Sequence, residues 1–281
     1  MFGKEKNTTI KFKNIYWELY RNACVPAEPP DLNISLEKKD CHKLLLISNA
    51  WLIRWPSQWD KKEISAFWYI IKEDYKGFGE FSRNTRNKIR RGLKRNAVQK
   101  IEKKELKTQG YPVYQSAFAR YDKSCKLTKN EFLQRIESLN PDQYEFWGVY
   151  QENSLVAYAE IRQMKDVINT SVLKFHPSFL TDYTSYALFY KLIEYYLGKC
   201  EKRYITNGAR SISHDSNIQY FLIEKFNFRK AYCKLNVCYR PILRHFIQLI
   251  YPFKKLTGKL TIWPFESLHA LLTQEYIKRH S

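Results

Sequence analysis

The sequence predicts an α+β protein built on a mixed β-sheet. Two alternating runs at 145–151 and 155–163, separated by a Glu-Asn-Ser turn, are typical of a β-hairpin. A third strand follows at 169–177, and the amphipathic helix 184–198 then leads to a strand at 202–208. A strand–helix–strand connection favours parallel neighbours, so the sheet mixes both strand directions. The order closes with a helix at 217–226 and a strand at 231–240.

Composition fits a folded, non-secreted chain. The 281 residues are 44% hydrophobic and 16% aromatic, enough to bury a sizeable core. No apolar run approaches the roughly 18 residues of a membrane-spanning helix, and the N-terminus lacks the apolar core of a secretory signal. Six scattered cysteines form no CxxC pair and have no histidine at ligand spacing, so we expect reduced thiols, no metal site and a cytoplasmic location.

Charge points to a polyanionic partner. The chain has 48 Lys plus Arg against 28 Asp plus Glu, a formal net charge of +20. Ten basic residues and one acidic residue lie between positions 83 and 104, where Ser82 is placed to cap a short helix. One helix face then carries candidate phosphate-binding or nucleic-acid-binding residues, namely Arg83, Arg86, Arg90 and Lys94. The alternative is a solvated helix face.

The rest of the chain divides less clearly. Residues 43–55 and 65–75 resemble strands, 98–106 an edge strand, and 111–124 and 129–139 helices. We therefore expect three parts: an N-terminal αβ portion at 1–110 with a basic helix at 82–98, a core at 111–240, and a C-terminal arm at 241–281.

That arm combines bulky apolar residues with lysines and arginines. It is expected either to pack as helices on the core or to lie on an anionic membrane surface, which would make the protein peripheral at the membrane.

The order of elements from 145 to 240 resembles the core of the GNAT acyltransferase superfamily. The segments that carry the resemblance are KFHPSF (174–179) and EKFNFRKAY (224–232). Two further stretches, SRNTRNKIRRGLKRNAV (82–98) and LFYKLIEYYLGKCEKRYITNGARS (188–211), are similar to the Fem-like branch of aminoacyl and peptidyl transferases. The resemblance implies a GNAT-like fold whose central parallel strands splay apart. It also implies transfer of an acyl or aminoacyl group to an amine-bearing acceptor.

The resemblance implies a co-substrate, acyl-CoA or aminoacyl-tRNA, rather than a bound cofactor. In acetyl-CoA-using members a Gly-rich loop after the central strand holds the pyrophosphate. The two usual glycine positions fall here on Tyr183 and Ser185, and Asp182 stands beside them, which argues against ordinary acetyl-CoA use.

Candidate site residues follow from these positions. His176 and Glu160 are candidate general bases, and Tyr183 is the candidate proton donor to the leaving group. Arg210 is the candidate phosphate ligand in the loop 207–217. The full set of candidate substrate-binding residues is Lys174, Phe175, Asp182, Ser185, Asn207, Arg210 and His214.

Two other functions stay open at this point. One is an acyl-CoA-dependent GNAT N-acetyltransferase that works despite the altered loop. The other is a non-catalytic basic module that binds RNA or an anionic membrane through residues 82–104 and the C-terminal arm.

Overall fold

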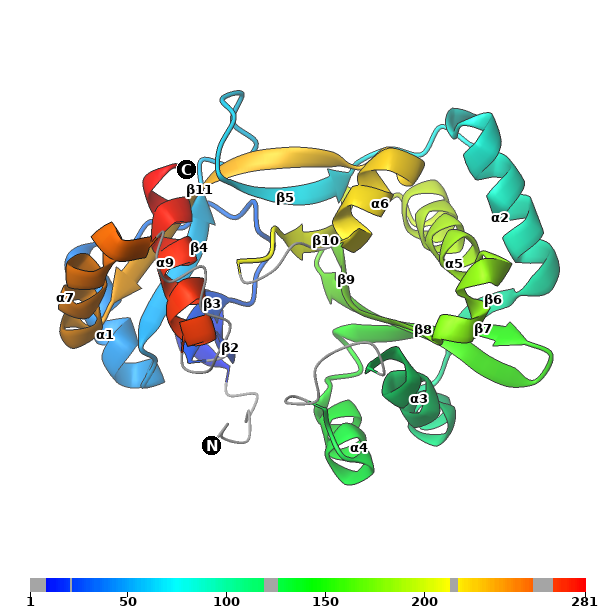
Figure 1. Cartoon of the computed structure of the whole chain (residues 1–281), viewed down its shortest axis with the longest axis horizontal. Coiled ribbons are helices and arrows are strands. Elements are labelled where there is room, and N and C mark those ends of the chain that lie inside the picture. The colour runs from blue at the N-terminus through cyan, green and yellow to red at the C-terminus, as the bar shows by residue number, and fades with distance from the viewer. Residues whose placement is uncertain (1–8, 21, 119–125, 213–216, 255–264) are drawn as a thin grey trace. The chain divides into compact units, whose positions relative to one another are not determined.

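The computed structural model describes residues 9–20, 22–118, 126–212, 217–254 and 265–281. The chain forms two compact units (Figure 1). Unit 1 comprises residues 1–69, 209–217 and 230–281, and unit 2 comprises residues 70–208 and 218–229. The grouping differs from the three parts expected from the sequence, because the basic helix joins the core and the C-terminal arm joins the N-terminal strands.

Unit 2 is built on a mixed sheet with strand order β10-β9-β8-β7-β6. The hairpin β7–β8 pairs antiparallel, β8 pairs antiparallel with β9, and β10 runs parallel to β9. The last strand, β6, is the expected edge strand, although it ends at Ile101. The strands are β6 (Ala97–Ile101), β7 (Tyr144–Gln151), β8 (Ser154–Met164), β9 (Val167–Phe175) and β10 (Tyr204–Ala209).

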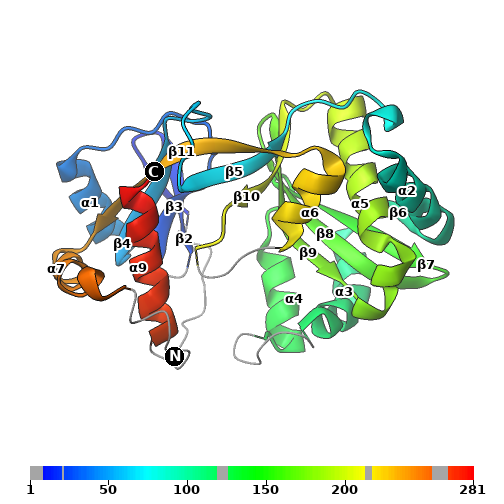
Figure 2. The same cartoon turned by 45° about the horizontal axis from the view of Figure 1, so that its top comes forward.

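Helices cover both faces of this sheet, α3 and α4 on one and α2, α5 and α6 on the other (Figures 1 and 2). The α3 side buries an aromatic core that includes Tyr114, Phe132 and Tyr158. The five helices are α2 (Arg83–Arg95), α3 (Lys103–Ala117), α4 (Lys129–Ser138), α5 (Thr184–Ile193) and α6 (Asn217–Phe226). A π-helical turn, Glu194–Lys199, extends α5 to the length the sequence predicts.

The basic helix α2 belongs to unit 2 because its buried face packs on α5. Ser82 caps it as expected, accepting a hydrogen bond from the Thr85 N–H at 3.2 Å. Thr85, Ile89 and Gly92 line its buried face. A Cβ atom at Gly92 would lie 2.7 Å from the Tyr183 carbonyl oxygen, so the two helices approach as closely as a glycine allows.

The strands of unit 1 stand in the order β1-β2-β3-β4-β11, with helices on both faces. Cys24 and Ile53 face α1, whereas their chain neighbours Ala23 and Leu52 face α7 and α9. The elements are β1 (Ile10–Phe12), β2 (Ile15–Tyr20), β3 (Ala23–Pro26), α1 (Lys38–Ser48), β4 (Leu52–Ser57), β11 (Arg229–Tyr239), α7 (Pro241–Ile250) and α9 (Phe265–Arg279). Strand β5 (Phe67–Lys72) contributes residues to both units and follows β11 in the strand order.

One predicted strand is wrong in its first half. Residues 43–48 belong to helix α1, and only the part from Leu52 onward is a strand. The run of four apolar residues at 44–47 fits a strand, but Leu44 and Leu45 pack inward while Leu46 and Ile47 are exposed, as on a helix. Short apolar runs do not distinguish a buried strand from a helix.

Candidate active site

The parallel strands β9 and β10 separate after a short stretch of pairing. Their register runs from Val167 opposite Tyr204 to Asn169 opposite Thr206 and then stops. Strand β9 continues beside β8 as far as Phe175, so the two parallel strands part as the sequence analysis expected.

A β-bulge and an amide side chain shape the start of this gap. The register of β9 against β8 shifts so that Ser171 is the extra residue between Thr170 and Val172. The Asn207 side-chain amide donates to the Thr170 carbonyl at 3.1 Å and to its hydroxyl at 2.8 Å. Asn207 therefore closes the narrow end of the gap.

Beyond Asn207 the main chain of β9 faces the gap without a paired strand. The His176 N–H bonds to the Val156 carbonyl of β8, so by alternation the main-chain groups of Leu173 and Phe175 point away from β8. Among the described residues, no strand pairs with them. These two N–H groups are the candidate donors to a developing oxyanion.

The side chain of Lys174 lies on the α3 side of the sheet. Its ammonium nitrogen is 4.3 Å from the ring centroid of Phe118 and 5.7 Å from that of Tyr114. Burial lowers the pKa of Lys174, the charge of Glu160 opposes that lowering, and the charge of Arg135 adds to it. A lysine with a lowered pKa is more readily deprotonated and can take part in proton transfer.

Glu160 is fully committed to an ion pair. Its carboxylate is buried and bonds to both terminal nitrogens of Arg135, in one case at 3.0 Å. Burial alone lowers the pKa of Arg135, but attraction to Glu160 outweighs it and raises that pKa. The sequence did not reveal Arg135, which lies on α4. The role of Glu160 as a general base stays a prediction.

Tyr158 adds a buried hydroxyl with no hydrogen-bond partner among the described residues. It lies directly opposite Lys174 on the neighbouring strand. Burial raises its pKa, so the phenol is protonated and can donate a hydrogen bond. Buried polar groups are nearly always paired, so an orphaned hydroxyl beside a desolvated lysine marks a place where a ligand group would be satisfied.

His176 and Tyr183 occupy structural positions at the ends of a 3₁₀ helix, Pro177–Asp182. The His176 Nδ1 accepts the Ser178 N–H at 3.3 Å, which makes it the cap of that helix. Tyr183 has φ 57°, the left-handed conformation that favours glycine, and the Arg91 guanidinium lies 5.0 Å from its ring centroid. Their proposed catalytic roles remain predictions.

The loop that would hold a coenzyme pyrophosphate is closed by α2. Asp182 forms an ion pair with Arg95 and accepts a hydrogen bond from Gln151 at 3.1 Å. Both partners lower the pKa of Asp182, and the hydrogen bond from Gln151 has the larger effect. The Asn96 side chain donates to the Asp182 carbonyl at 3.0 Å. The N–H groups of Ser178, Phe179 and Tyr183 already donate within the loop, so they are not offered to a phosphate.

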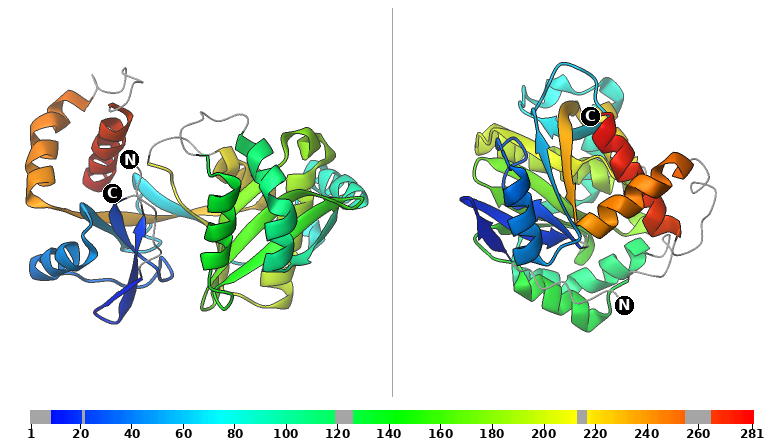
Figure 3. Two further views of the ribbon diagram at one scale, coloured as in Figure 1. Left: turned by 90° about the horizontal axis from the view of Figure 1, so that it is seen from below. Right: turned by 90° about the vertical axis from the view of Figure 1, so that its left-hand side faces the viewer.

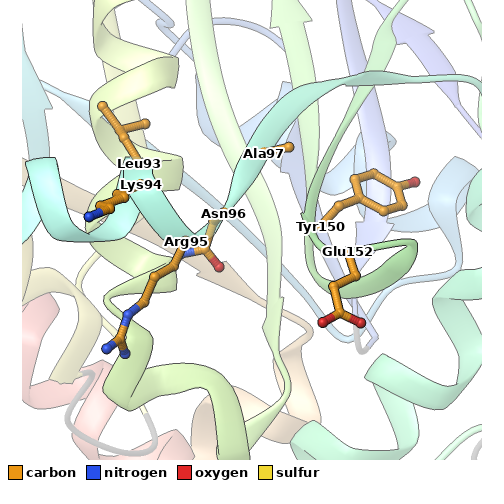
Figure 4. A pocket seen from close by; sticks show the side chains of 7 residues that line it. All are labelled: Leu93, Lys94, Arg95, Asn96, Ala97, Tyr150 and Glu152. Atoms are coloured by element: carbon orange, nitrogen blue, oxygen red, sulfur yellow. The ribbon is translucent and has the colours of Figure 1, made fainter.

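A shallow pocket of about 310 Å³ lies beside this loop, where α2 meets β6 and the β7–β8 turn (Figure 4). Lys94 and Arg95 line it from the end of α2, and Glu152 lines it from the turn. The pocket is therefore lined by both positively and negatively charged side chains.

The remaining predicted residues are dispersed. Arg210 lies in unit 1, where its guanidinium donates to the Ala66 carbonyl at 2.9 Å. Ser185 is half-buried in the first turn of α5, and His214 lies outside the described residues. On α2, Arg83 and Lys94 are exposed.

The other two members of the predicted basic face have protein partners. The Arg86 guanidinium donates to the carbonyls of Gly79 and Phe81, at 2.9 and 3.0 Å. The Arg90 guanidinium lies 5.0 Å from the centroid of the Phe78 ring. Arg86 and Arg90 therefore contact the segment that precedes α2, and their phosphate binding stays a prediction.

Sequence reasoning missed Arg135, Tyr158, Tyr114 and Phe118. Only the alternation of Tyr158 with Glu160 along β8 hinted that both face one side of the sheet. Their meeting with Arg135 and Phe118 depends on how α3 and α4 dock.

No protein-family model matches the chain, and no curated protein sequence matches it. Among solved structures, FemX superposes with a TM-score of 0.55 at 12% sequence identity, covering 84% of this chain and 86% of FemX. The C-terminal domain (DUF2156) of a protein described as a lysylphosphatidylglycerol synthetase, from Agrobacterium fabrum, gives 0.52 at 10% identity, with 83% and 84% covered. A conserved protein of unknown function from Bacteroides thetaiotaomicron gives 0.52 at 11% identity, with 83% and 85% covered. At these identities the likeness shows the fold: the chain has the GNAT fold in its Fem-like form.

Proposed function

We propose that the chain is an N-acyltransferase that moves an acyl or aminoacyl group from an activated donor to an amine. The observation that carries the proposal is the parting of β9 from β10 after Asn169, which leaves the Leu173 and Phe175 amides without a paired strand among the described residues. A carbonyl held there would gain two hydrogen bonds as its oxygen becomes an oxyanion, and positioning would supply much of the remaining rate.

Lys174 and Tyr158 are assigned to the same reaction. The attacking amine must lose a proton, and Lys174, whose pKa is lowered by burial, can accept it and then return it to the donor's leaving oxygen as the ester bond breaks and the amide bond forms. Tyr158 donates a hydrogen bond to the substrate from the adjacent strand. Glu160 and Arg135 hold the charge pattern that surrounds Lys174.

The donor best supported is an aminoacyl ester rather than a coenzyme A thioester. The loop that would bind a coenzyme pyrophosphate presents the Asp182 carboxylate and contacts the end of α2 through Arg95. Three of its N–H groups, those of Ser178, Phe179 and Tyr183, already donate within the loop. The exposed cations of α2 instead suit a long polyanion such as tRNA.

Transfer assays with charged tRNA and with acyl-CoA, each offered a mixture of amino acids, polyamines and aminolipids, test this directly. Tyr158→Phe is the sharpest variant, because it removes only the orphaned hydroxyl. We expect an unchanged or higher melting temperature and a transfer rate lowered about tenfold or more. Lys174→Met should abolish most activity, whereas Lys234→Met, an exposed strand lysine in unit 1, should not.

The salt dependence of tRNA binding tests the proposed donor. If tRNA is bound through α2, replacing Arg83 and Lys94 with alanine should reduce the slope of log K against log salt by about 1.4–1.8. Transfer from acyl-CoA with no transfer from charged tRNA would refute the donor assignment, and full activity of Tyr158→Phe would refute the site.

A further inference from the structure

Helix α7 of unit 1 is apolar on two opposite sides. Leu243, Ile247 and Ile250 pack inward against the sheet. The outward stripe consists of Ile242, Phe246, Leu249 and Phe253, at spacings of four, three and four residues, and Ile242 and Leu249 are 79% and 74% exposed. A helix apolar on both sides is ordinarily covered on both sides.

Helices α1 and α7 lie at the same end of unit 1 (Figures 1 and 3), and the α1 segment carries a second exposed apolar group. It consists of Leu46 and Ile47 at the end of α1 and the nearby Trp51. Arg240, the residue before α7, bonds to the segment that carries Trp51. Its N–H donates to the Trp51 carbonyl at 3.0 Å, its side chain donates to the Ala50 carbonyl at 2.7 Å, and its guanidinium lies 5.8 Å from the Trp51 ring centroid.

The charge within the two segments that carry these apolar groups has one sign. No acidic residue occurs at 41–59 or 241–254, whereas exposed His42, Lys43, Arg244 and His245 lie among the apolar side chains. Monomeric proteins seldom expose large apolar groups of this kind without a partner for them. Cations among exposed apolar side chains suit an anionic lipid surface, which offers phosphates beside an apolar interior.

We infer that this surface, made of the outer stripe of α7 with Leu46, Ile47 and Trp51, docks the protein on an anionic lipid bilayer. The apolar side chains enter the boundary between headgroups and acyl chains, Trp51 lies at headgroup level, and Lys43 and Arg244 meet lipid phosphates. No helix in the described part of the chain is both long and apolar enough to span a bilayer, so the contact is interfacial. The inference does not depend on the transfer chemistry.

Vesicle flotation of the full chain tests it. Wild type should float with phosphatidylcholine vesicles containing about a third phosphatidylglycerol and remain unbound with pure phosphatidylcholine. Replacing Ile242, Phe246 and Leu249 together with serine should weaken binding by about tenfold or more, because these side chains supply the inserted apolar area. The matched control is Ile64→Ser, an isoleucine of unit 1 that is 85% exposed and lies outside the surface.

Variants that remove one positive charge give an independent test of the lipid contact. Lys43→Gln and Arg244→Gln should each weaken binding to the anionic vesicles by about fivefold, with the folded state unchanged. Failure of wild type to bind anionic vesicles, or equal binding by the triple serine variant, would overturn the inference. So would a dimer, measured by light scattering without lipid, that the triple variant dissociates while vesicle binding is absent.

Discussion

Replacing Arg135 with methionine should destabilise unit 2 strongly, because it leaves the Glu160 carboxylate buried without its cation. The Glu160 side chain is only 1% exposed, whereas that of Arg135 is 32% exposed. Removing one partner of a buried pair costs about 3–5 kcal/mol. We expect about 3 kcal/mol, the lower end, because Arg135 is partly hydrated and the Lys174 charge still attracts the orphaned carboxylate.

The assay is urea unfolding followed by circular dichroism, completed as a double-mutant cycle with Glu160→Gln. The double variant removes both charges, so it should recover at least half of the loss and give a coupling energy of about 1–3 kcal/mol. Lys234→Met serves as the surface control and should change stability by about 0.5 kcal/mol or less. A loss below about 1 kcal/mol for Arg135→Met, or strictly additive single effects, would show that the pair is not the electrostatic anchor of the site.

Three further results are expected. Gly92→Ala should cost about 1–3 kcal/mol in thermal or urea unfolding, since its methyl group would meet the Tyr183 carbonyl at 2.7 Å; a neutral result would mean that α2 shifts freely on α5. Ser82→Ala should cost about 1 kcal/mol by removing the cap of α2, and Ser82→Thr should restore most of it. Lys174 should react with acetic anhydride at lower pH than exposed lysines do, as measured by mass spectrometry of the acetylated protein. Glu160→Gln should lower the pKa of Lys174 further, because it removes an attracting charge. Burial places the pKa of Lys174 in the folded state below its value in the unfolded chain. Between these two pKa values the unfolded state binds more protons, so the contribution of Lys174 to stability grows as pH rises through that interval. A reactivity profile against pH like that of an exposed lysine would contradict this.

The GNAT-like core was predictable because its elements carry strong local signals. The hairpin 144–164 alternates residue by residue, and helix α6 matches its predicted bounds, 217–226. Helix α1 was mistaken for a strand because its apolar run is too short to show a helical period. The three N-terminal strands, β1 to β3, were not predicted.

The candidate site residues stay predictions, but the structure shows which of them have protein partners. The sequence placed candidate residues Lys174, Phe175 and His176 at the end of the third core strand, and β9 and β10 stop pairing before them, after Asn169. The residues it favoured as acid or base were mostly engaged elsewhere: His176 caps a helix, and Glu160 is paired with Arg135.

By itself the sequence determined the order of elements in the core, the cap and charge of α2, and the two-sided apolar pattern of α7, because each depends on residues a few positions apart. Only the tertiary structure decided which charges are paired and which polar groups are buried. Arg135 reaches Glu160 from 25 positions away, and Tyr158 loses its water only when α3 closes over the sheet. Burial and ion pairing arise between segments, so the pKa of Lys174 and the orphaned hydroxyl beside it are properties of the folded chain.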